Sequence, residues 1–379
     1  MDYRKMDKIG VNTSLLGFGC MRFPLSADGK IDVSESEKML TAAYNAGVNY
    51  FDTAYPYHDG ASEPFTGRVL NKFERSTYYL ATKLPCWEVH TLDDAKRLFE
   101  SQLKRLDKDY VDFYLLHSLG RETWDRMVKL GVIEFCEQLK AEGRIRNFGF
   151  SFHDEYPVFE EIASYRAWDF CQIQLNYMDV EEQAGIKGYE LADKLGIPVV
   201  VMEPIKGGSI AGFPEDITSV FHKLRPDASA ASWAIRWVAD LPNVKVILSG
   251  MTSMEQLEDN IKTVSPFEPL TPEEKKAVKE VAAILLSRVN NNCTGCKYCM
   301  PCPFGLDIPY NFKVWNSFGI YQNAAQLKWD WVLSMEDKYK AKNCTECGQC
   351  EDACPQKISI RADLKKLQVE LDEVIAASK

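Results

Sequence analysis

Short apolar runs alternate with amphipathic stretches along the first 270 residues or so, at intervals of about 25 to 35 residues. The apolar runs are rich in Val, Ile, Phe and Tyr and lack strict alternation, which is typical of strands buried on both faces. They predict eight strands, at residues 14–19, 49–54, 78–84, 110–117, 145–152, 170–177, 198–204 and 244–250. The stretches between them have helical periodicity and predict helices at residues 35–46, 92–106, 125–141, 158–168, 228–239 and 254–264.

Eight strand–helix units predict an α/β fold of the (β/α)8 TIM-barrel type. The alternative is an open doubly wound sheet, which would carry a GxGxxG phosphate-binding turn after its first strand. The segment from Gly17 to Arg22 does not have that pattern. We therefore expect a closed barrel.

A proline-rich segment at residues 265–272 marks a change of composition and ends the predicted barrel. Thr271 is the expected N-cap of the next helix, residues 273–287, with Pro272 at its first position. A last amphipathic helix is expected at residues 362–377. The prediction is a barrel domain over residues 1–268 and a smaller, mostly helical domain over residues 269–379.

The chain has 379 residues, a formal net charge of −10 and a pI near 5.2, which argues against nucleic acid or an anionic membrane as a partner. Its beginning lacks the apolar core of a signal peptide. The longest aliphatic stretch, residues 281–286, is too short to span a bilayer. We expect a cytoplasmic protein.

Eight of the twelve cysteines form two runs near the C-terminus, each ending in Cys-Pro. The runs contain Cys293, Cys296, Cys299 and Cys302, and then Cys344, Cys347, Cys350 and Cys354. Three cysteines at successive two-residue spacings, followed by a fourth before proline, are typical of [4Fe–4S] ligation. Disulfides or paired zinc sites are the weaker alternatives, because no secretion signal is present and zinc sites usually use two separated CxxC pairs. Two [4Fe–4S] clusters are therefore predicted.

The cysteine runs resemble those of bacterial two-cluster ferredoxins, in which the fourth cysteine of each run ligates the other cluster. This resemblance implies a ferredoxin-like iron–sulfur domain with crossed ligand sets. The first set would be Cys293, Cys296, Cys299 and Cys354, and the second Cys344, Cys347, Cys350 and Cys302.

Four polar residues follow successive predicted strands: Asp52, Tyr57, Lys83 and His117. Taken singly, each has an ordinary structural interpretation, such as a loop cap or a surface charge. Together they resemble the catalytic tetrad of the aldo-keto reductase superfamily. The resemblance spans roughly residues 8 to 265 and implies that Tyr57 is the general acid or base, with a pKa lowered by Lys83. Asp52 would hold Lys83, and His117 would orient the substrate oxygen.

The same resemblance implies a nicotinamide site at the ends of the later strands. Ser151 and Gln174 would hold the carboxamide, with Met202 against the ring where the family has an aromatic residue. The remaining residues of this predicted site are Arg22, Lys206, Ser249, Gly250, Gln256 and Asn260. Gln256 stands where many members have an arginine, so Lys206 is the expected partner of a 2′-phosphate. NADPH is the expected cofactor, and NADH is possible.

The predicted function is NAD(P)H-dependent reduction of a small carbonyl substrate, or the reverse oxidation of an alcohol, with the clusters carrying single electrons. A hydride carries two electrons, and the sequence has no flavin motif to divide the pair. Two alternatives stay open: clusters with a structural or redox-sensing role, or a cofactor-sensing regulatory subunit that binds a redox protein partner.

Overall fold

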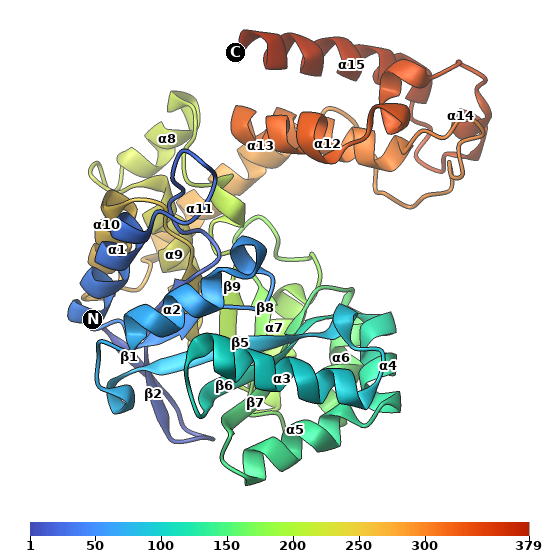
Figure 1. Cartoon of the computed structure of the whole chain (residues 1–379). Helices are drawn as coiled ribbons and strands as arrows, with labels where there is room; N and C mark the ends of the chain where they lie inside the picture. The colour runs from blue at the N-terminus through green and yellow to red at the C-terminus, as the bar shows by residue number, and fades with distance from the viewer. Residues whose placement is uncertain (379) are drawn as a thin grey trace. The chain divides into compact units, whose positions relative to one another are not determined.

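The computed structural model describes residues 1–378 and contains a closed barrel of eight parallel strands (Figure 1). Around the barrel the strands follow the order β10-β3-β4-β5-β6-β7-β8-β9. Their bounds are β3 Leu16–Gly19, β4 Tyr50–Asp52, β5 Tyr79–Pro85, β6 Val111–Leu119, β7 Ile145–Phe152, β8 Phe170–Gln174, β9 Val199–Met202 and β10 Val244–Ser249. All eight predicted strands are present, so the predicted TIM barrel is confirmed.

Large apolar side chains fill the barrel interior. Tyr50, Phe113 and Phe170 are fully buried there, with ring centroids 4.9 to 5.0 Å apart between successive pairs. Gly17 of β3 leaves them room, because a Cβ at this position would lie 2.6 Å from Val246 Cγ1. The interior is therefore a packed core, and reactive groups can lie only at the ends of the strands.

Helices follow the strands and cover the outside of the barrel. They are α1 Val33–Asn45, α2 Ser62–Leu70, α3 Leu92–Leu106, α4 Arg121–Lys129, α5 Val132–Ala141, α6 Tyr156–Tyr165, α7 Gly185–Lys194, α9 Ala230–Ala239 and α10 Met254–Thr263. Helix α8 Glu215–His222 belongs to a second compact unit. The single helix predicted at residues 125–141 is wrong: Gly131, with φ of 72°, separates α4 from α5. The hydrophobic periodicity of the sequence also did not predict α2, α7 and α8, because each of these helices is short and is interrupted by glycine or polar residues.

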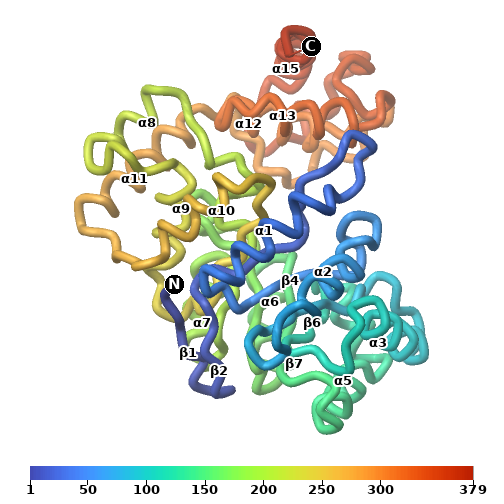
Figure 2. The backbone as a smooth tube through the Cα atoms, turned by 60° about the vertical axis from the view of Figure 1, so that its left-hand side comes forward, coloured from blue at the N-terminus to red at the C-terminus, as the bar shows by residue number. Residues whose placement is uncertain are grey.

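An unpredicted hairpin closes the amino-terminal end of the barrel. Strands β1 (Tyr3–Met6) and β2 (Val11–Ser14) pair antiparallel (Figure 2). Arg4 donates hydrogen bonds to the carbonyl oxygens of Leu241 and Val244, at the start of β10. This end of the barrel is thereby blocked, which leaves the carboxyl end for chemistry.

The second compact unit consists of Gly208–Ala230 and of the described residues from Lys276 onward. It contains α8, most of α11 Pro272–Leu286, and the helices α12 Ile308–Tyr321, α13 Ala324–Lys328, α14 Gln349–Ala353 and α15 Ile360–Ala377, with a π-helical turn η5 at Trp329–Ser334. Trp315 of α12 donates to Glu370 (2.7 Å) and Trp331 of η5 to Asp372 (3.0 Å), which joins both elements to α15. The predicted mostly helical second domain is confirmed.

The first unit consists of Met1–Gly207 and Ala231–Lys275, so the segment that contains α8 groups with the second unit. This division by contacts does not test where the barrel domain ends, so the boundary predicted between residues 268 and 269 stays a prediction. No helix within residues 1–378 is long and apolar enough to cross a membrane.

Gly17→Ala should lower the free energy of unfolding by about 1–3 kcal/mol, because the added methyl group overpacks the barrel interior. Urea denaturation followed by circular dichroism measures this loss. Gly212→Ala is the control, since a Cβ at Gly212 meets no atom within 4 Å. Equal stability of the two variants would contradict the packed interior.

Candidate active site

The four tetrad residues lie together at the carboxyl end of the barrel. Asp52 is the last residue of β4, while Lys83 and His117 lie near the ends of β5 and β6. Tyr57 begins a short 3-10 turn, η1 (Tyr57–Gly60), in the loop after β4. Parallel strands bring their carboxyl ends to one rim, which is why residues up to 65 positions apart in sequence converge (117 − 52).

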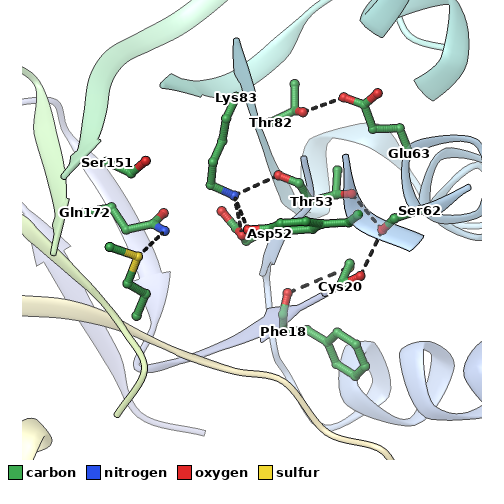
Figure 3. Close-up of polar contacts among 12 residues, drawn as sticks. Phe18, Cys20, Asp52, Thr53, Ser62, Glu63, Thr82, Lys83, Ser151 and Gln172 are labelled. Atoms are coloured by element: carbon green, nitrogen blue, oxygen red, sulfur yellow. Dashed lines mark hydrogen bonds and ion pairs between the residues drawn. The ribbon is translucent and has the colours of Figure 1, made fainter. Parts of the chain in front are cut away.

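Lys83 and Asp52 form a buried ion pair. Lys83 is 0% exposed, and its Nζ donates to Asp52 Oδ1 at 2.6 Å and to the Thr53 carbonyl oxygen at 2.8 Å (Figure 3). Burial by itself lowers the pKa of Lys83, but the negative charges of Asp52 and of an ionised Tyr57 outweigh it and the pKa is raised overall. Burial raises the pKa of Asp52, and the adjacent ammonium opposes that effect. Lys83 is therefore a fixed positive charge at neutral pH.

The Tyr57 hydroxyl accepts a hydrogen bond from Lys83 Nζ at 3.4 Å, longer than the usual value of about 2.9 Å. Burial raises the pKa of Tyr57, and the attraction of Lys83 lowers it by a smaller amount, so the pKa is raised overall. The lowered pKa expected from the sequence is therefore wrong in its net direction. Tyr57 is protonated at neutral pH, as a proton donor must be.

His117 faces Tyr57, with ring centroids 6.1 Å apart in an edge-to-face arrangement. Burial, and then the charge of Lys83, hold the pKa of His117 well below its usual 6.5, so the imidazole is neutral. Its Nδ1 is buried and has no hydrogen-bond partner among residues 1–378. The Trp87 ring also lies close to His117, at 5.0 Å between ring centroids, and Trp87 is 38% exposed. A neutral imidazole can donate one hydrogen bond to a ligand.

Two buried side chains on β7 and β8 lie opposite each other at the same rim. Ser151 and Gln172 are register partners and are 1% and 2% exposed. Gln172 Nε2 donates to the Met202 sulfur at 3.4 Å, while its Oε1 is buried without a partner in the described chain (Figure 3). An unpaired buried amide oxygen is costly unless a ligand donates to it, so Gln172 is a candidate ligand contact.

The sequence pattern instead selected Gln174, two residues further along β8. Gln174 donates to Asp179 at 2.8 Å and accepts from Gln183 at 2.8 Å, so its amide is used within the protein. Only the register of β7 with β8 distinguishes the two glutamines, because Gln172 and Gln174 lie on the same face of one strand.

Asp179 also engages Lys206, the residue predicted to meet a 2′-phosphate. Asp179 is 2% exposed and forms an ion pair with the Lys206 ammonium. A second acidic residue, Glu182, lies 3.9 Å from the same ammonium. Lys206 is therefore already neutralised by protein carboxylates.

The other predicted cofactor residues lie around the end of β10. Asn260 donates to the Ser249 hydroxyl at 2.8 Å, and both are buried. Gln256 accepts from the Thr252 backbone N–H at 2.8 Å. Arg22 passes closely over Gly250, where a Cβ would lie 2.7 Å from Arg22 Cγ. Arg22 is exposed, and no ion pair between it and a carboxylate is present within residues 1–378.

The eight clustered cysteines line two neighbouring cavities of the second unit. One cavity is lined by Cys299, Cys302, Cys344, Cys347 and Cys350, and the other by Cys293, Cys296, Cys299 and Cys354. Cys302 thus lies with the second run and Cys354 with the first.

None of the twelve cysteines forms a disulfide. Within residues 1–378, no three His, Cys, Asp or Glu side chains meet closely enough to hold a single metal ion. A cubane differs from a single ion, because each of its four irons takes its own thiolate and the sulfur atoms surround the whole cluster. Cysteine-lined cavities suit such a group.

Two known families match this chain, one over the barrel and one over the cysteine-rich region. Residues 15–283 match the Aldo/keto reductase family, and residues 292–358 match the 4Fe-4S dicluster domain. The chain belongs to the aldo/keto reductase family, as an oxidoreductase of that family with a 4Fe-4S dicluster domain at its C-terminus.

Known relatives share the barrel at modest identity. A probable voltage-gated potassium channel subunit beta of Arabidopsis thaliana is 26% identical, covering 72% of this chain and 94% of that protein. L-galactose dehydrogenase of the same plant is 25% identical, covering 75% and 94%. The solved aldo-keto reductase AKR11C1 from Bacillus halodurans is 26% identical with a TM-score of 0.63, covering 74% of this chain and 96% of that one.

Lys83→Met should destabilise the barrel by about 3–5 kcal/mol, because it leaves the Asp52 carboxyl buried without its counter-charge. The double variant Asp52→Asn/Lys83→Met removes both charges, so its free energy of unfolding should fall clearly less than that of Lys83→Met. Urea denaturation measures both losses. Glu100→Gln, which removes an exposed ion pair with Arg144, serves as the control and should change stability by less than about 1 kcal/mol. If the single and the double variant lost the same free energy of unfolding, the two charges would not be coupled.

Proposed function

We propose that the barrel reduces a small carbonyl compound with NADPH, or oxidises the corresponding alcohol in reverse. The observation that carries this proposal is the position of the Tyr57 hydroxyl, 3.4 Å from the ammonium of the buried Lys83–Asp52 pair and with its ring facing His117. A reduced nicotinamide, when bound, supplies the hydride that carbonyl reduction needs. The protein must supply the proton and the geometry.

Tyr57 gives its proton to the substrate oxygen as the alcohol forms. The Lys83 ammonium stabilises the phenolate that remains until solvent returns the proton. His117, neutral because of burial and the Lys83 charge, donates a hydrogen bond to the same oxygen and orients the carbonyl group. Asp52 keeps Lys83 in place. In the oxidation direction the same residues act in reverse, with Tyr57 as the base.

The carboxamide of the nicotinamide is proposed to bind Ser151 and Gln172, with Met202 against the ring. The unpaired Oε1 of Gln172 supports this assignment over Gln174. Arg22 is the proposed partner of a cofactor phosphate, because Lys206 is held by Asp179. NADPH is the proposed cofactor, because Arg22 could pair with its 2′-phosphate. NADH stays the alternative.

For the second unit we propose two [4Fe–4S] clusters with crossed ligands, as the lining of the two cavities supports. Such clusters, when bound, would supply one-electron chemistry for exchange with a redox partner. Thiolate-bound clusters favour a reducing compartment, and we propose the cytoplasm. The domain boundary at residues 268/269 belongs to the same proposal.

A cofactor-sensing regulatory role is the second candidate function. It is favoured by the relative named as a probable potassium channel subunit beta. The complete tetrad favours the enzyme instead, because a binding role alone does not require a proton donor.

Tyr57→Phe should lower the rate of carbonyl reduction at least about 100-fold, because it removes the hydroxyl that donates the proton in this proposal. The assay follows NADPH oxidation with benzaldehyde, methylglyoxal and cyclohexanone, while fluorescence titration should show unchanged NADPH binding. The wild-type rate should not fall as the pH approaches the ordinary pKa of a tyrosine, about 10, because burial raises the Tyr57 pKa and keeps the donor protonated. Full turnover by the Tyr57→Phe variant would refute the proposed chemistry.

Crossed ligation predicts which cysteine variants lose the same cluster. Wild-type protein purified without oxygen should hold about eight irons, four in each cluster. Cys354→Ser should leave the same residual EPR spectrum as Cys296→Ser, and Cys302→Ser the same as Cys347→Ser, because each pair lines one cavity. Cys171→Ala, in the buried barrel strand β8, is the control and should keep all the iron. Matching spectra for Cys302→Ser and Cys296→Ser would indicate uncrossed ligation.

A further inference from the structure

We propose that Glu63 and Arg105, which lie outside the barrel wall, are positioning residues that set the distance between the Tyr57 hydroxyl and the Lys83 ammonium. This inference rests on the proposed reductase function and identifies residues that act on its proton donor without touching it. The buried carboxylate of Glu63 forms hydrogen bonds toward the Lys83 strand and an ion pair with Arg105 toward the Tyr57 loop.

The first side of this network holds the strand that carries Lys83. Glu63, on α2, is 0% exposed, and its Oε1 accepts from the Thr82 hydroxyl at 2.6 Å (Figure 3). The same oxygen accepts from Gln102 Nε2 at 2.9 Å. Gln102 also donates to the Lys83 carbonyl oxygen at 2.9 Å, and Tyr114 fixes its orientation by donating to Gln102 Oε1 at 2.8 Å. Glu63 is thereby connected to the backbone of Lys83.

The second side holds the loop that carries Tyr57. The other carboxylate oxygen of Glu63 forms an ion pair with Arg105 Nε at 3.0 Å. Arg105 donates to the carbonyl oxygen of Tyr55 at 3.1 Å and to that of Gly60, and its guanidinium lies 4.5 Å from the Tyr55 ring centroid. These two residues flank Tyr57 in sequence. One ion pair therefore joins the Lys83 strand to the Tyr57 loop.

The Tyr57 loop needs such support because part of its backbone is strained. His58 and Asp59 have φ values of 52° and 53°, in the left-handed region that side-chain-bearing residues rarely adopt. Strained residues persist only where surrounding contacts hold them. Lys83, by contrast, is fixed independently by Asp52 and the Thr53 carbonyl oxygen. Loss of the Glu63–Arg105 pair should thus move Tyr57 relative to a stationary Lys83.

The close contact of α2 with α3 shows that the network is built into the fold. A Cβ at Gly67 of α2 would lie 2.1 Å from the Leu106 carbonyl oxygen at the end of α3. Only glycine allows this approach, which brings Glu63 to Gln102 and Arg105. Burial raises the pKa of Glu63, while its hydrogen bonds and the Arg105 charge oppose that effect.

The test compares Glu63→Gln and Arg105→Met with wild-type protein, using benzaldehyde and NADPH. A displacement of about 1 Å in a reacting group can cost about 100-fold in rate, so kcat should fall by about 10- to 100-fold. The KM for benzaldehyde and the Kd for NADPH should change by less than about 2-fold, because neither residue touches a ligand. The solvent deuterium isotope effect on kcat should increase as proton transfer from Tyr57 becomes rate-limiting.

Two further variants separate positioning from stability. Glu63→Gln/Arg105→Met should be no slower than the worse single variant, because both residues act through one connection. Arg105→Lys keeps a charge beside Glu63 and should recover part of kcat. Glu100→Gln is the matched control, since it removes an exposed carboxylate of α3 from its ion pair with Arg144 and should leave kcat unchanged.

An unchanged isotope effect, or a loss of kcat that only follows the unfolded fraction measured by circular dichroism, would overturn the inference. If Glu63→Gln does not fold, Arg105→Met and Arg105→Lys test the same connection. Full turnover by Tyr57→Phe would instead refute the proposed function itself, so the two failures are distinguishable.

Discussion

The active site depends on one buried charge, the Lys83 ammonium at the carboxyl end of the barrel. An isolated ammonium in this position would be desolvated and would lose its proton. The carboxylate of Asp52, 2.6 Å away, and the carbonyl oxygen of Thr53 keep it charged. Burial is the main reason that the pKa of His117 is lowered, and the Lys83 charge adds to it; for Tyr57, the same charge partly offsets the rise in pKa that burial causes. Burial and one ion pair together therefore set the protonation of the four residues.

A charge is useful in proton transfer only if the donor lies at the right distance from it. The barrel strands fix Asp52, Lys83 and His117 by their hydrogen-bonded register, but Tyr57 lies in a loop. Helices α2 and α3 hold this loop through the ion pair of Glu63 with Arg105 and the hydrogen bond from Arg105 to the Tyr55 carbonyl oxygen. In this respect the helices do more than cover the strands, because their packing determines where a loop residue lies in the site.

The second unit has a different basis for its stability. Its core of buried tryptophans and leucines is small, and its eight cysteines line cavities that apolar side chains do not fill. A small domain with cavities has little hydrophobic stabilisation of its own, and metal ligation can supply the remainder. Helices α12, α13 and α15 hold the two cysteine runs in place by packing on each other. The same thiolates can therefore serve both stability and electron exchange.

The sequence by itself determined the features that depend on local spacing and periodicity. Buried parallel strands have continuous apolar runs, so eight runs predicted the eight-stranded barrel, and the cysteine spacing predicted an iron–sulfur domain. It could not show the break between α4 and α5 at Gly131, which rests on one backbone dihedral angle. Nor could it distinguish Gln172 from Gln174, because both lie on one face of β8 and only the pairing with Ser151 separates them. The raised pKa of Tyr57 and the connection from Glu63 to Arg105 were likewise decided by the tertiary structure, because burial and contacts between distant helices have no signature in the local sequence pattern.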